Sequence, residues 1–90
     1  MSYNWHQKRV LDSALPLSHR YSHLRSCALS VASLLKRRRS AIISEVRERT
    51  GINIEGGGDE AQLLHALGCL NEIRATALES AGGVAAHNDA

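Results

Sequence analysis

The feature that most constrains this 90-residue chain is an apolar ladder that begins at Leu17 and ends at Val46. Its first part follows alternating steps of four and three, at Leu17, Tyr21, Leu24, Ala28, Val31 and Leu35. This spacing places the side chains on one face of an α-helix and is typical of a helix that packs against another helix. We therefore predict a long helix over residues 16–50. A basic run, Lys36 to Arg39, interrupts the ladder and leaves open whether this helix is kinked or broken near residues 38–40.

A second helix is predicted over residues 59–81, after a glycine-rich turn over residues 51–58. Gly51 is typical of the residue that follows the end of a helix. Asp59 and Gln62 have the spacing of a capping box, in which two side chains satisfy backbone N–H groups in the first helical turn. The chain is therefore expected to form a helical hairpin.

Both ends of the chain extend this hairpin. Residues 1–15 predict a short helical extension, whereas Gly82-Gly83 predicts the end of the second helix and a flexible tail over residues 82–90. A single hairpin leaves apolar residues uncovered on both helices, and a chain of this length buries too little surface to be very stable alone. We therefore predict one all-α domain over residues 1–90, an antiparallel helical hairpin with an N-terminal extension. It closes either as a three-helix bundle or, slightly favoured, as a dimeric four-helix bundle.

Charge is unevenly distributed along the chain. Residues 1–50 hold ten of the eleven Lys and Arg residues and three acids, a net charge of +7, whereas residues 51–90 hold one base and six acids, a net charge of −5. Either the two halves attract each other within a bundle, or the basic half meets an anionic partner. The solvated helix face is the more common explanation of such a charge run.

Catalytic and cofactor-binding motifs are not found in the sequence. No Gly-Lys-Ser/Thr follows Gly56-Gly57-Gly58, so these glycines predict a turn and not a phosphate loop. The many serines do not form the Gly-x-Ser-x-Gly pattern of a nucleophile elbow. We expect no enzyme, no cofactor and no small-molecule substrate. Two cysteines without a disulfide framework and the lack of a long apolar segment predict a cytoplasmic protein without membrane contact.

Two sets of residues have the spacing of metal ligands. Steps of four place His19, His23 and Cys27 on one helix face, and His65 and Cys69 on another. Within a hairpin these two sets lie at opposite ends, because the turn pairs His65 with Ser44 and not with the first set. We therefore expect no metal site.

The function that this pattern favours is a non-enzymatic protein–protein interaction module, such as a small helical adaptor, chaperone or regulator. The first half of the ladder has no opposite helix long enough to cover it. We expect it to present an apolar face to a protein partner or to a second copy, next to cations that attract an acidic surface. The expected partner-binding residues are Leu24, Val31, Leu35, Arg37, Arg38 and Ile42.

The alternative is a small dimeric nucleic-acid-binding regulator. Arginine side chains at the basic run can donate to phosphate oxygens. The residues expected to bind nucleic acid are Lys36, Arg37, Arg38, Arg39 and Arg47. The aromatic residues that single-strand binders place between such cations are missing here.

Overall fold

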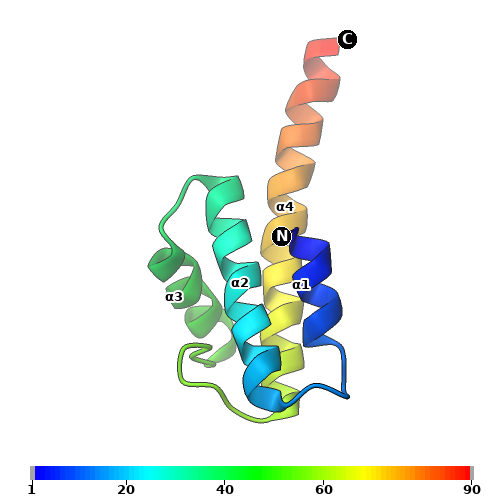
Figure 1. Ribbon diagram of the computed structural model, residues 1–90. Helices are drawn as coiled ribbons and strands as arrows, with labels where there is room; N and C mark the ends of the chain where they lie inside the picture. Colours follow the sequence, from blue (N-terminus) through cyan, green and yellow to red (C-terminus); the bar gives the residue numbers. More distant parts are fainter. Residues whose placement is uncertain (1, 90) are drawn as a thin grey trace.

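The computed structural model describes the backbone of residues 2–89 and the side chains of residues 2–80. This part of the chain folds into helices alone, which confirms the all-α prediction (Figure 1). The helices are α1 (Tyr3–Val10), α2 (Leu17–Leu35), α3 (Arg39–Thr50) and α4 (Glu60–Asp89). Dimer formation stays a prediction.

The helix predicted over residues 16–50 is fully broken, and the break lies at Lys36. This residue has the left-handed backbone conformation, with φ of 54°. The N–H groups of Lys36 and Arg37 donate to the carbonyl oxygens of Ser33 and Ala32 at 3.3 and 2.9 Å. This bond pattern is the Schellman motif, which ends a helix by satisfying its last carbonyl groups. Arg38 is extended, and α3 starts in a new direction at the next residue.

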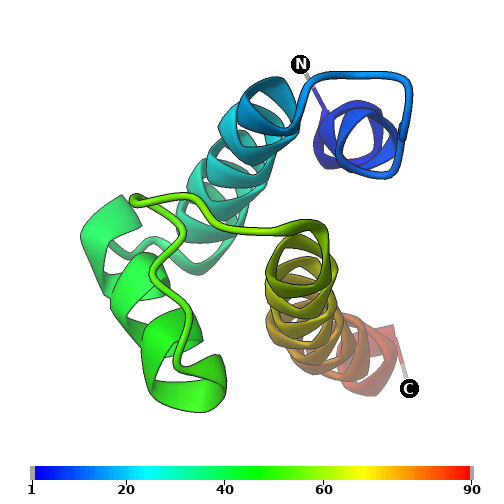
Figure 2. The ribbon, with the colours of Figure 1, turned by 90° about the horizontal axis from the view of Figure 1, so that it is seen from below.

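The break changes how the apolar ladder is covered. α2 contacts the three other helices, and α1 and α3 lie on opposite sides of it (Figure 2). α4 contacts all three as well. The prediction of an uncovered apolar face over residues 17–35 is therefore wrong, because α1 folds back and α3 turns back along the bundle. The buried ladder residues are Tyr21, Leu24, Ala28, Val31, Ile42, Ile43 and Val46.

Tyr3 fastens α1 to α4. Its side chain is buried, and its hydroxyl donates to Asn71 Oδ1 on α4. The guanidinium of Arg74 lies 4.5 Å from the centroid of the Tyr3 ring, in the position of a cation–π contact. The predicted N-terminal extension is thus a packed helix of the domain.

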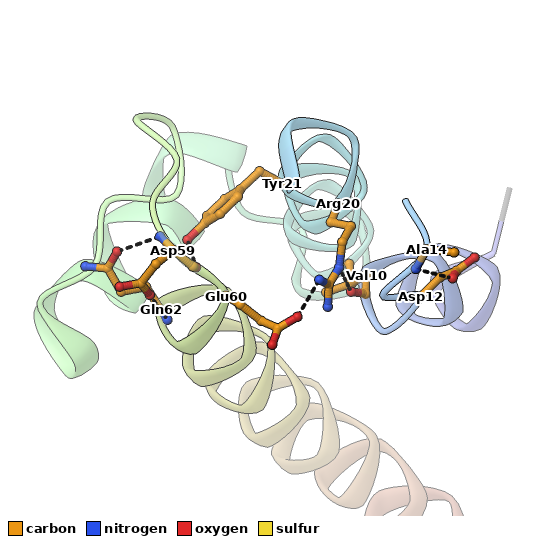
Figure 3. A network of polar contacts seen from close by, with 8 residues as sticks. All are labelled: Val10, Asp12, Ala14, Arg20, Tyr21, Asp59, Glu60 and Gln62. Carbon is orange, nitrogen blue, oxygen red and sulfur yellow. Dashed lines mark hydrogen bonds and ion pairs between the residues drawn. The ribbon is translucent and has the colours of Figure 1, made fainter. Parts of the chain in front are cut away.

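A polar network joins the lower ends of α1, α2 and α4 (Figure 3). Arg20 is 5% exposed, and its Nε donates to the carbonyl oxygen of Val10 at 2.7 Å. Its Nη1 donates to Glu60 Oε2 at 2.7 Å. The Tyr21 hydroxyl donates to the carbonyl oxygen of Asp59 at 2.9 Å. Two neighbouring residues of α2 therefore hold the last turn of α1 and the start of α4.

The predicted start of α4 is confirmed in detail. The Gln62 N–H donates to Asp59 Oδ1 at 2.8 Å, and the Asp59 N–H donates to Gln62 Oε1 at 3.0 Å, which is the reciprocal pair of a capping box. Gly51, with φ of 77°, ends α3 as expected.

α4 projects beyond the other helices at the end of the bundle where α2 finishes (Figure 1). It continues to Asp89 and does not stop at the predicted position near residue 81. The predicted flexible tail over residues 82–90 lies outside the part of the chain whose side chains are described. In the described residues, no helix combines the length and apolar character that crossing a membrane requires.

Candidate functional site

Three of the residues expected to contact a partner lie in the core of the chain. The side chains of Leu24, Val31 and Ile42 are 0% exposed, because α1, α3 and α4 cover them. This corrects the expectation that they form a surface. Leu35 is half-buried against the core, whereas Arg37 and Arg38 are exposed.

Leu35 and Arg37 line a groove at the end of the bundle from which α4 projects. We call it the α4 groove, and it has a volume of about 290 Å³. The residues that line it are Leu35, Arg37, Glu45, Arg49, Ile73, Thr76, Ala77 and Ser80. Its apolar members come from α2 and α4, and its charged members come from α3 and the preceding connection.

Two large apolar side chains are exposed next to groove residues in the sequence. Leu34 and Leu78 are each 42% exposed, and they precede Leu35 and follow Ala77 respectively. This end of the bundle thus combines an open groove with exposed leucines and arginines.

Glu45 organises the charges of the α4 groove. Its Oε1 accepts from Arg37 Nη1 at 2.6 Å, and its Oε2 lies 2.7 Å from Arg49 Nη2. The hydrogen bond from Arg37 lowers the pKa of Glu45, and the positive charge of Arg49 adds to this effect against the opposing effect of burial. The carboxylate is therefore ionised at neutral pH and fixes both guanidinium groups.

The basic run does not form one continuous cationic surface. Arg37 pairs with Glu45, and Arg39 Nη2 lies 2.7 Å from Glu55 Oε1. Within the part of the chain whose side chains are described, Lys36, Arg38 and Arg47 form no ion pair, and all three are exposed.

The two sets of candidate metal ligands do not form a common site. His19 and His65 are exposed on α2 and α4, whereas Cys27 and Cys69 are buried. Burial raises the pKa of the Cys27 thiol to about 12 and also raises that of Cys69. Over residues 2–80, no three His, Cys, Asp or Glu side chains are grouped as a metal site.

One contact between histidines joins α1 to α2. His6 Nδ1 lies 2.9 Å from His23 Nδ1, which is a hydrogen-bond distance. The Trp5 ring packs edge-on against both imidazoles, with centroid distances of 5.0 and 5.3 Å. The Arg9 guanidinium lies 4.9 Å from the centroid of the Trp5 ring. We call Trp5, His6 and His23 the histidine cluster.

Burial is the main cause that lowers the pKa of both His6 and His23. The positive charge of the other histidine adds to it for His6, and those of Arg9 and His19 add to it for His23. Both imidazoles are therefore neutral at pH 7.

Sequence reasoning did not find most of the α4 groove or His6. No sequence motif includes Ile73, Thr76 or Ala77. These residues line a groove only because α4 continues past the end of α2. His6 stands beside Trp5 in a segment whose position against α2 was open. Only the pairing of α1 with α2 reveals the contact to His23.

Comparison of the chain with protein-family models, curated proteins and solved structures finds no match. No function is therefore carried over from a relative. The functions of the α4 groove and the histidine cluster are therefore inferred from their geometry and charge.

Proposed function

We propose that this chain is a non-enzymatic protein–protein interaction module that binds its partner in the α4 groove. The observation that carries the proposal is the open groove itself. Leu35, Ile73 and Ala77 give it apolar walls at the end where α4 projects beyond α2. Ile73 is buried at the base of the groove, while Leu35 and Ala77 keep part of their apolar surface accessible, and an apolar surface of this kind is suited to contact with another protein.

The size of the groove favours a protein segment over a small molecule. Pockets for drug-sized ligands have volumes of about 300–1,000 Å³ and enclose most of the ligand. The α4 groove, at about 290 Å³, is at the lower limit of that range and is open to solvent. It suits a few apolar side chains on one face of a partner helix.

The charges around the groove favour an acidic partner. Arg38 follows Arg37 in the sequence, is exposed and forms no ion pair in the described residues, so its guanidinium is free to donate to a partner carboxylate. Arg37 and Arg49 already pair with Glu45, so a partner carboxylate would compete with Glu45 for them. Leu35, Arg37 and Arg38 thus remain proposed contact residues, and Thr76 and Ala77 replace the three buried ones.

Nucleic-acid binding by the basic run has less support. Arg37 and Arg39 already pair with Glu45 and Glu55, so two of the five expected cations are partly neutralised. A phosphate backbone would have to compete with these carboxylates.

Two glutamate substitutions on α4 test the proposal. Thr76→Glu adds a bulky anion to the groove at an exposed position, and Ala61→Glu adds the same group at an exposed position in the first turn of the helix. The tagged chain is purified from its own cells, its stoichiometric protein partner is identified by native mass spectrometry, and the affinity of the purified partner is measured. We expect Thr76→Glu to weaken binding at least tenfold, because its carboxylate fills the groove and repels an acidic partner, and Ala61→Glu to leave binding unchanged.

Equal partner affinity of the two variants would contradict the proposal. Retention of nucleic acid with affinity that falls steeply between 50 and 200 mM salt would favour the alternative function instead.

A further inference from the structure

The histidine cluster has the donor groups and the spacing of a small metal site. His6 and His23 come from different helices, and their Nδ1 atoms lie 2.9 Å apart. Neutral imidazole is the most common protein ligand of transition metals. Two such nitrogens at a helix–helix contact form a chelating pair whose remaining coordination positions face solvent.

The choice of ion follows from the chemistry of the ligands. The 2.9 Å between the two Nδ1 atoms is the length of their hydrogen bond, and ring rotation changes it when a metal binds. Among divalent first-row ions, copper binds nitrogen ligands most tightly, and its square-planar preference is met by two imidazoles and two waters.

We propose that His6 and His23 bind divalent copper between α1 and α2, with water in the remaining equatorial positions. A rotation of the two rings about their Cβ–Cγ bonds turns both Nδ1 lone pairs toward the ion. This site is independent of the α4 groove.

The protonation states of the two rings suit this reaction. The hydrogen bond requires that one Nδ1 carries no proton, so at least that imidazole is neutral and has a free lone pair. In the pair, one ring carries its proton on Nδ1 and the other accepts it. When copper takes both Nδ1 atoms, that proton moves to Nε2 of the same ring through solvent. No electron is transferred and no net proton is released.

Neighbouring charges set the strength of the site. Arg9, on α1, places a positive charge near the pair. This charge opposes a bound dication, so Arg9→Gln should tighten copper binding about two- to fivefold.

Trp5 provides the measurement, because it is the only tryptophan in the chain and packs against both rings. Copper(II) chloride is titrated into the protein at pH 7.4 while the Trp5 fluorescence is recorded, and nickel(II) serves as a second probe that does not oxidise thiols. We expect saturable quenching, weakened at least tenfold in His6→Gln and in His23→Gln. The matched controls His19→Gln and His65→Gln should change the affinity less than threefold.

Three results would overturn the proposal. The first is the absence of saturable binding, and the second is unchanged affinity in His6→Gln. The third is a loss of affinity in His19→Gln while His6→Gln is unaffected, because the ion would then lie between His19 and His23 on α2. If His6→Gln does not fold, electron paramagnetic resonance of copper bound to the unmodified protein decides. Hyperfine splitting from two imidazole nitrogens supports the site, and splitting from one or none contradicts it.

Discussion

Arg20 is the side chain whose loss should most weaken the closure of α1 over α2. It donates to the Val10 carbonyl oxygen and to the Glu60 carboxylate, each at 2.7 Å, while it is itself 5% exposed (Figure 3). We consider Arg20→Met, which keeps most of the side-chain volume and removes both hydrogen bonds.

The expected loss of stability follows from the two partners. A buried carbonyl group left without a donor costs about 1–3 kcal/mol, and Val10 is fully buried. The side chain of Glu60 is 58% exposed, so its ion pair contributes at most about 1 kcal/mol. We therefore expect a loss of about 1–4 kcal/mol. For a chain of this size the melting temperature should fall by about 4–8 °C for each kcal/mol lost.

Urea unfolding followed by far-ultraviolet circular dichroism measures this free energy. The matched control is Glu60→Gln, which removes only the charge of the exposed partner and should cost less than about 1 kcal/mol. A loss below about 0.5 kcal/mol in Arg20→Met would refute the reasoning. So would an equal loss in both variants, since the ion pair would then account for the whole effect.

Three further predictions concern the break, the core and the histidine cluster. Lys36→Gly should stabilise the chain by about 1 kcal/mol, because glycine adopts the left-handed conformation without the clash that a Cβ causes, and a destabilised variant would argue against the Schellman ending. Leu24→Ala should cost about 2–5 kcal/mol in urea unfolding, and a loss independent of protein concentration would place this side chain in the core of a single chain. Because folding lowers the pKa of His6 and His23, the unfolded chain binds protons first, so stability should be complete above about pH 6.5 and fall below it. Thermal unfolding between pH 7.5 and 5.0 measures this decline, and an equal decline in the His6→Gln/His23→Gln double variant would contradict its cause.

The sequence predicted the helix ends that depend only on neighbouring residues. The capping box at Asp59 and Gln62 and the glycine at position 51 are satisfied by atoms within one turn, so their outcome did not depend on the rest of the fold. The heptad-like spacing likewise placed Leu24 and Val31 on one helix face, although it did not show that this face is buried within the chain.

The break at Lys36 could not be assigned because its residue gives no local signal. A lysine is a good helix former and rarely has positive φ, so the sequence indicated a possible kink or break only near residues 38–40 and not at Lys36. Tertiary packing decides the position: the chain ends α2 there, and α3 can return against α2 and α4. Together with the packing of α1 on α2, this return places Leu24, Val31 and Ile42 in the core and not on the expected surface.

Both candidate sites depend on how helices are placed relative to one another. The α4 groove arises from the different lengths of α2 and α4, and the histidine cluster arises from the contact of α1 with α2. A sequence pattern within one helix shows which residue types are present at these sites. It does not show which residues of the other helices lie beside them. The basic run was visible in the sequence, whereas its division by Glu45 and Glu55 was not.

The central claim is that the α4 groove binds a protein, and site-specific photo-crosslinking in the chain's own cells tests it most directly. A photoreactive phenylalanine analogue replaces Thr76 in the groove or, as the control, Leu11, which is 53% exposed at the end of α1. The account predicts a discrete crosslinked protein from position 76 and none from position 11. Equal crosslinking from both positions, or crosslinking from position 11 alone, would contradict it.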